Sequence, residues 1–139
     1  MRDVNYILLF FIALIPQTNY AQSIQNCSNM FIGKIDSKGV VIGRNNMMIG
    51  RIVENGEIID KNNMLVGRIK QDGTIIDKNN VMVGKVGSDG TVIDRNNMMV
   101  GKVRPDGIVI DRNNMTIGYA KDIPIRLAAV FFFFNMFER

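Results

Sequence analysis

Residues 84–100 read GKVGSDGTVIDRNNMMV, and residues 101–117 repeat this stretch as GKVRPDGIVIDRNNMTI. The same pattern runs through residues 33–49, 50–66 and 67–83, so five copies of 17 residues follow one another without a gap. Each copy begins with glycine, as does the closing segment, residues 118–137. Self-similarity at a short fixed period indicates one supersecondary unit per copy, whose core forms only when neighbouring units pack together.

Each copy contains two turn signals that separate β-branched runs. The first ends in glycine, mostly as Asn-Gly or Asp-Gly, and glycine accepts the positive φ of a tight hairpin. The second contains Asn-Asn, whose side chains bond to nearby backbone and tolerate the left-handed region. The sequence therefore predicts β-hairpins, with strands such as residues 91–94 and 98–103. The predicted turn residues are Gly39, Gly56, Gly73, Gly90 and Gly107, together with Asn45, Asn62, Asn79, Asn96 and Asn113.

Three architectures fit a repeated hairpin: a closed ring, an open single-layer sheet and a parallel β-helix. A β-helix would stack Arg51 on Arg68 and Lys61 on Lys78, which like charges oppose, although stacked asparagines would favour it. A ring spreads these charges apart and leaves no exposed sheet edge. We therefore predict an all-β fold of five hairpin repeats closed into a five-fold ring, like a flower or propeller, with the parallel β-helix as the alternative.

Two repeated residue types are predicted to serve packing. The glycine that opens each copy lies within a strand, where it weakens pairing unless the backbone approaches something closely. Methionine occupies the fifteenth and sixteenth positions, and its flexible thioether suits the irregular space at the centre of a ring. These predicted core methionines are Met47, Met48, Met64, Met82, Met98, Met99 and Met115.

The chain ends differ from the repeats. Residues 127–134 are all apolar, which predicts a strand buried on both faces that pairs with residues 30–35 and closes the ring. At the other end, Arg2, an apolar run over residues 6–15 and the small residue Ala21 predict a signal peptide over residues 1–21. Residues 22–29 then form a short polar leader, and residues 30–137 form the repeat domain. We expect an exported protein, periplasmic or extracellular.

The composition excludes much chemistry. The 139 residues include no histidine and one cysteine, so a Ser-His-Asp triad, a His-ligated metal and an internal disulfide are excluded. Each repeat turn pairs one aspartate with one cation, which argues against calcium, and core packing accounts for the methionines without Cu(I). We predict a non-enzyme without cofactor or metal. Cys27 is an unpaired thiol, for which an intermolecular disulfide is the alternative.

Basic residues recur at two positions of each copy. The first set is predicted to form a ring that could hold an acidic glycan, a phosphate or a lipid headgroup. Aromatic residues lie only near the two ends of the chain, which argues against a nucleic-acid partner. The first set is Lys34, Arg51, Arg68, Lys85 and Lys102, and the second is Arg44, Lys61, Lys78, Arg95 and Arg112.

The repeat also resembles a known family. Residues 84–98, read again over residues 101–115, together with Gly118-Tyr119-Ala120, Ala128-Ala129-Val130 and the phenylalanine run, are similar to the five-fold β-flower proteins of bacteria. The resemblance covers residues 30–137. It implies a five-fold arrangement of short hairpins behind a signal peptide, with no established activity and no catalytic residues.

The first copy departs from this pattern, with Gly43 in place of aspartate and Lys38 before Gly39. We expect a non-enzymatic structural or interaction module of the cell envelope, not membrane-spanning, with the anionic-ligand module as the alternative.

Overall fold

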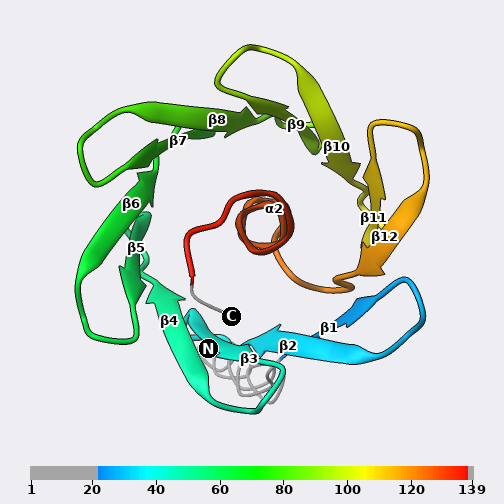
Figure 1. Ribbon diagram of the computed structural model, residues 1–139, viewed down its shortest axis with the longest axis horizontal. Helices are drawn as coiled ribbons and strands as arrows, with labels where there is room; N and C mark the ends of the chain where they lie inside the picture. The colour runs from blue at the N-terminus through cyan, green and yellow to red at the C-terminus, as the bar shows by residue number, and fades with distance from the viewer. Residues whose placement is uncertain (1–21, 138–139) are drawn as a thin grey trace, which may run out of the picture.

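The computed structural model describes residues 22–137 of the chain, so the predicted signal peptide lies outside the described residues. The described chain forms a ring of strands around one helix (Figure 1). The elements are β1 (Gln22–Asn26), β2 (Phe31–Ile35), β3 (Val40–Gly43), β4 (Met48–Ile52), β5 (Glu57–Asp60), β6 (Leu65–Ile69), β7 (Thr74–Asp77), β8 (Met82–Val86), β9 (Thr91–Asp94), β10 (Met99–Val103), β11 (Ile108–Asp111), β12 (Thr116–Tyr119) and α2 (Ile125–Phe133).

The strands form a closed antiparallel barrel. Every strand pairs with its neighbours in the chain, and β1 pairs with β12, so that the ring has no free edge. The prediction of a closed β ring is confirmed. The alternative of a parallel β-helix is wrong, because every strand pair of the barrel is antiparallel.

The residues predicted as a polar leader are a strand of the wall. Asn26 on β1 pairs with Gly118 on β12, as Asp111 pairs with Gly101 between β11 and β10. The side-chain oxygen of Asn26 also accepts the N–H groups of Ser28 and Met30 at 2.9 and 3.0 Å. Residues 22–29 thus supply the first half of an additional hairpin.

The two ends of the ring therefore carry different numbers of hairpin turns. Five turns with glycine, the inner turns, join β2 to β3 and each later pair up to β10 and β11. Six turns with asparagine, the outer turns, join β1 to β2 and each later pair up to β11 and β12. The ring thus holds six outer hairpins where the sequence predicted a five-fold ring. The non-covalent pair of β12 and β1 takes the place of a sixth inner turn.

Both kinds of turn use the same local geometry. In an inner turn the N–H of Gly56 donates to the carbonyl oxygen of Val53 at 2.8 Å, and in an outer turn Asn63 donates to Asp60 at 3.0 Å. The last residue of each three-residue loop is left-handed, as such hairpins require. The inner-turn glycines have φ of 85–96°, and the second asparagine of each outer turn has φ of 64–68°.

The predicted turn asparagines are the first of each Asn-Asn pair, and they are not the left-handed residues of these turns. Asn62, Asn79, Asn96 and Asn113 each donate their backbone N–H to the aspartate two residues earlier, at 2.8 Å. They hold the turn while the following asparagine takes the left-handed conformation. The left-handed residues are Asn29, Asn46, Asn63, Asn80, Asn97 and Asn114.

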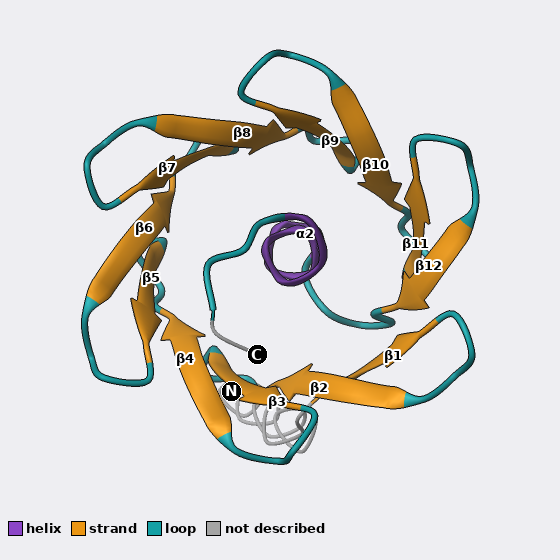
Figure 2. Ribbon diagram, viewed as in Figure 1, coloured by secondary structure: helices purple, strands orange, loops and turns teal. Residues whose placement is uncertain are grey.

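The predicted aromatic closing strand is a helix instead. α2 covers residues 125–133, and β2 pairs with β1 and β3, not with the apolar run. The physical reason is that every wall strand already has two partners, so no edge remains to satisfy a further strand. A segment inside the barrel must satisfy its own backbone, which a helix does. Figure 2 shows α2 at the centre of the ring.

The barrel interior is filled in layers. Two sets of inward-facing wall residues surround α2, whose residues Ala128, Ala129 and Val130 are fully buried. The small helix residues leave space for the branched wall residues, because a core fills its volume without voids. The two wall sets are Ile24, Val41, Ile58, Ile75, Val92 and Val109, and Ile35, Ile52, Ile69, Val86, Val103 and Ala120.

A third layer explains the glycine that opens each copy. These six glycines, the glycine ring, face the last residues of the chain, and a methyl group at any of them would come within 3.0 Å of a large side chain. The close approach predicted for these glycines is therefore to residues 131–137, which we call the aromatic tail. One side chain of the tail packs against the glycine of each hairpin. The facing pairs are Phe131 with Gly33, Phe132 with Gly118, Phe133 with Gly101, Phe134 with Gly84, Met136 with Gly67, and Phe137 with Gly50.

Candidate functional site

The methionines of the repeats are exposed, and the prediction that they fill the core is wrong. They follow the outer turns, where eleven large apolar side chains have exposed fractions of 36–68%. These are all the exposed large hydrophobic residues among residues 22–137. We call them the collar: Met30, Phe31, Met47, Met48, Met64, Leu65, Val81, Met82, Met98, Met99 and Met115.

The outer turn itself places the collar outside the core. The Asp60 carboxylate accepts the N–H groups of Asn62 and Met64 at 2.8 and 2.9 Å, which directs the chain around the tip. Leu65 then pairs with Ile59 at the start of β6, beyond the level of Gly67, where the aromatic tail ends the core. In Figures 1 and 2 the outer turns are the outermost points of the ring.

The second predicted set of cations lies within the collar turns. Arg44, Lys61, Lys78, Arg95 and Arg112 are all exposed, each three residues before a collar side chain. In the first outer turn the equivalent position is held by the exposed thiol of Cys27. The neighbouring aspartates bind their own turns through Oδ1, as Asp94 does with Asn96 and Met98. No group of three metal-binding side chains gathers anywhere in residues 22–137.

The predicted ligand ring, Lys34, Arg51, Arg68, Lys85 and Lys102, lies on the outer surface of the wall. Each follows a glycine of the glycine ring and precedes an inward-facing isoleucine or valine, so strand alternation turns it outward. Successive members are two strands apart, about 10 Å along the wall. A compact anion cannot touch all of them. The structure distributes these cations around the ring without bringing them together.

Two of these cations have partners on the wall. Arg68 forms an ion pair with Glu57 on the neighbouring strand, with 3.1 Å between Nη2 and Oε2. Arg51 donates through Nη2 to the Oδ1 of Asn63, the left-handed residue of the next outer turn, at 3.0 Å. Arg51 thus reaches toward the collar, whereas Arg68 lies beside the inner turns, where it shares a pocket with Lys70 and Arg126.

Both ends of the ring are close to charge balance. The collar turns hold five basic side chains against four acidic ones, the outer-turn aspartates. The inner turns and the segment leading into α2 hold five basic against six acidic side chains. The basic excess of residues 22–137 therefore lies on the wall, where the predicted ligand ring has Glu57 as its one acidic neighbour on the strands' outer face.

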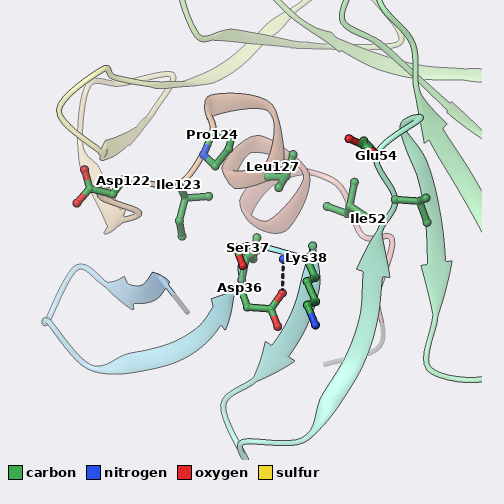
Figure 3. A pocket seen from close by; sticks show the side chains of 12 residues that line it. Asp36, Ser37, Lys38, Ile52, Glu54, Asp122, Ile123, Pro124 and Leu127 are labelled. Atoms are coloured by element: carbon green, nitrogen blue, oxygen red, sulfur yellow. Dashed lines mark hydrogen bonds between the residues drawn. The ribbon is translucent and has the colours of Figure 1, made fainter. Parts of the chain in front are cut away.

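A cleft of about 970 Å³ lies at the opposite end, between the first two inner turns and the segment that enters α2. Figure 3 shows Asp36, Glu54 and Asp122 around it, with Lys38 beside Asp36. The Asp36 carboxylate accepts the backbone N–H groups of Lys38 and Val40, both at 2.9 Å. This carboxylate therefore serves its own turn.

Two other inner-turn carboxylates are more acidic than usual. The N–H of Thr74, followed in importance by its hydroxyl, lowers the pKa of Asp72 from the ordinary value of 3.8. The same two groups of Thr91 lower the pKa of Asp89. Hydrogen bonds to the charged form favour it. The shifts belong to turn structure and repeat with the hairpin, so they do not mark a catalytic acid.

The described chain is a closed ring of repeated hairpins with a C-terminal segment in its centre. A family model described as "5-fold beta-flower protein" matches residues 21–136. The chain belongs to this family. The match covers β1 as well as most of the aromatic tail, so the resemblance seen in the repeats extends to both segments that complete the ring. The description of the β-flower family specifies a fold and names no activity.

Neither the curated proteins nor the solved structures contain a match to this β-flower. Within residues 22–137, α2 is shorter than a membrane-crossing helix needs to be, and no other described helix meets that length and apolarity.

The collar is the feature that sequence reasoning missed. Its sequence signal is the position of methionine directly after a three-residue Asn-Asn turn, as in Asn97-Met98-Met99. A residue at the tip of a hairpin cannot reach the barrel interior, whatever its hydrophobicity. Likewise, Ser28-Asn29-Met30 lies 17 residues before Asn45-Asn46-Met47 and marks the additional outer hairpin.

Proposed function

We propose that this β-flower is an exported, non-enzymatic interaction module of the cell envelope that docks on its partner through the collar. The observation that carries the proposal is that every exposed large apolar side chain of residues 22–137 lies at the outer turns. Soluble proteins normally scatter such residues singly, and a gathered set marks an interaction surface. Export is supported by the apolar run and small residue in residues 1–21.

The fold does not need the collar for its own core. The barrel interior is filled by wall residues, α2 and the aromatic tail, while collar side chains such as Met47 and Met64 are more than half exposed. An apolar side chain left in water gains nothing for folding and becomes favourable only when a partner covers it. The collar is thus available for docking without any rearrangement of the ring.

A second candidate is the binding of an anionic partner through Lys34, Arg51, Arg68, Lys85 and Lys102. The basic excess of the wall, five cations against Glu57, favours it. Because these side chains are spread around the outside of the wall, the partner they fit is an extended surface, not a compact phosphate or a short glycan.

A photoactivatable methionine analogue tests the collar directly. Apart from Met1 and Met136, every methionine of the chain belongs to the collar. We expect the labelled protein to form covalent adducts in the cells that make it. A Met→Leu collar variant, which keeps the apolar surface and leaves no label in the collar, should lose the collar adducts while fractionating with the same cell component.

A second variant tests whether the apolar surface itself is needed. With Met47, Met64 and Met98 changed to Gln, the protein should leave the cell component with which the wild type fractionates. Adduct yields equal to those of the Met→Leu variant, or unchanged fractionation of the Gln variant, would overturn docking through the collar.

A further inference from the structure

We infer that the cleft between the second and third inner turns binds a small anion that carries an apolar group, a carboxylate or a phosphate monoester on a short hydrocarbon chain. The cleft has a volume of about 540 Å³ and lies where α2 begins. The inference goes beyond docking through the collar, because it concerns the inner turns. It follows from the differences among these turns, the cations that meet in the cleft and the apolar part of its lining.

The inner turns are the part of the repeat in which the five copies differ most. From the first copy to the fifth, the three residues before the turn glycine read DSK, VEN, KQD, GSD and RPD, and no two of these stretches are alike. The outer turns, by contrast, contain Asn-Asn in every copy. Loops that differ on a uniform scaffold give one part of a repeated surface its own binding properties. The third inner turn contributes Lys70 to the cleft in this way.

Arg126 reaches the cleft from outside the repeats. It is the one charged residue of α2, whose other eight residues are apolar. Its Nη1 donates to the carbonyl oxygen of Lys70 at 3.4 Å, and its Nη2 lies beside Gly73 of the same turn. No carboxylate of residues 22–137 forms an ion pair with this guanidinium. Most of its N–H donors therefore remain available, in the fork that matches two oxygens of a carboxylate or phosphate.

Lys70 differs from the equivalent cation of another inner turn. Arg104, at the same position of the fifth turn, forms an ion pair with Asp106 of its own turn at 2.9 Å. In the third turn, Asp72 accepts the N–H of Thr74 through Oδ1 and forms no ion pair with Lys70. Within residues 22–137, the charge of Lys70 thus has no ion-pair partner, and an anion in the cleft would supply one.

Basic side chains outnumber acidic ones around the cleft. Arg126, Lys70 and Arg68 line it together with one carboxylate, Glu54. Arg68 is already paired with Glu57 at 3.1 Å, so the net positive charge comes from the other two cations. Like charges held near one another repel, and an anion between them removes that repulsion. The larger cleft on the other side of the second inner turn holds three acidic side chains against one basic, so an anion favours the smaller cleft.

The rest of the cleft lining is largely apolar. Ile52 and Ile69 of the wall are buried, and Val53 and Leu127 are half-buried. Figure 3 shows Ile52 and Leu127, which line the larger cleft as well as this one. Small-molecule sites combine such a lining with a few polar groups, and a volume of about 540 Å³ lies within their usual range. An inorganic ion would leave the apolar lining uncovered, so the ligand carries an apolar group.

Titration calorimetry of the purified protein tests the inference. The probes are octanoate and octyl phosphate, which share an apolar chain and differ in their anionic group. Inorganic phosphate and octanol each provide one half of such a ligand. We expect an octyl anion to bind, and inorganic phosphate and octanol to bind at least about tenfold more weakly, because each loses one of the two kinds of contact. The tighter of the two octyl anions identifies the ligand as a carboxylate or a phosphate.

Charge variants locate the site. Arg126→Gln should weaken binding of the octyl anion by about tenfold or more, because hydrogen bonds from a charged group are lost. Lys70→Gln should weaken it by about two- to fivefold, as expected for an exposed cation. Arg126→Lys keeps the charge without the fork and should bind between the wild type and Arg126→Gln. The matched control is Arg104→Gln, which removes an inner-turn cation outside the cleft and should bind like the wild type.

The inference is overturned if neither octyl anion binds the wild type, or if Arg104→Gln and Lys70→Gln lose affinity equally. It is also overturned if the collar variant with three methionines changed to Gln loses binding that Arg126→Gln retains, because the ligand would then lie at the collar. Circular dichroism checks that each variant is folded. If Arg126→Gln does not fold, Lys70→Glu decides, since it reverses an exposed charge and should abolish binding, and unchanged binding would contradict the site.

Discussion

The glycine ring and the collar are neighbours in every repeat, yet they face opposite surroundings. Gly67 lies two residues after Leu65, but the glycine packs against Met136 inside the barrel while the leucine is exposed at the rim. Both positions recur throughout the repeats. The difference shows that a repeated apolar pattern serves two purposes here, since the interior positions make the fold and the rim positions remain available to a partner.

The largest effect is expected from the aromatic tail. Phe131 is 1% exposed and fills the space in front of Gly33. Phe131→Ala should lower the free energy of unfolding by about 3–5 kcal/mol, because the ring of wall strands cannot collapse onto the cavity. Denaturant unfolding measures it. The rim control, Met98→Ala, should stay within about 0.5 kcal/mol. Similar losses for the two variants would erase the distinction between interior and rim.

The glycine ring should give the next largest loss. A Cβ at Gly101 would meet both the Phe133 ring and the Ile110 carbonyl oxygen, so Gly101→Ala should cost about 1–3 kcal/mol of unfolding free energy. Adding Phe133→Ala relieves only the first of these contacts, so rescue should be partial. Gly87→Ala is the matched control, because a methyl group there meets only the Asp89 carboxylate, at 3.0 Å, and a more distant oxygen. Complete tolerance of Gly101→Ala in thermal unfolding would disprove close packing at this position.

A smaller loss is expected at the outer turns. Asn97 has φ of 68°, a conformation that an alanine adopts at a cost of about 1 kcal/mol. Asn97→Ala should therefore lower stability by that amount, while Asn97→Gly should lie within a few tenths of the wild type. Chemical denaturation of the two variants distinguishes these cases. Equal stability of the two variants would mean that the left-handed backbone does not limit the turn.

The smallest effect is a dependence on pH from the inner turns. The folded-state pKa of Asp72 and of Asp89 lies below the ordinary value of 3.8, so the folded protein binds fewer protons than the unfolded chain. Their stabilisation is complete above 3.8 and is lost as the pH falls through the lowered pKa values. The melting temperature should thus decline in acid, and less steeply for Asp72→Asn with Asp89→Asn. Parallel curves would exclude these carboxylates as the source.

Sequence reasoning succeeded where a local rule decides the structure. The period of 17 residues and the two turn signals predicted hairpins in a closed ring, because a left-handed turn position restricts the residue that occupies it. The glycine within each strand predicted a close approach, although not its partner. These inferences depend on a few neighbouring residues and on the absence of an exposed edge.

It failed where the conformation of a segment depended on which strand edges and interior positions other segments of the chain already occupied. Residues 127–134 are apolar on every side and fit a strand or a helix equally well by pattern. The pairing of β1 with β12 left no edge, and that alone makes the segment a helix. The methionines were predicted to lie in the core because they are apolar, but the aromatic tail fills the position opposite the glycine ring.

The sequence by itself determined the hairpin, its two turns and the number of complete copies, since these follow from backbone preferences within each 17-residue unit. The tertiary structure decided how the ring closes, what fills it and which apolar residues stay outside. The physical reason is that closure and filling are competitions between segments far apart in the chain. β1 completes the wall by pairing with β12, and the aromatic tail packs in the interior against the glycine ring. The collar side chains therefore remain at the surface.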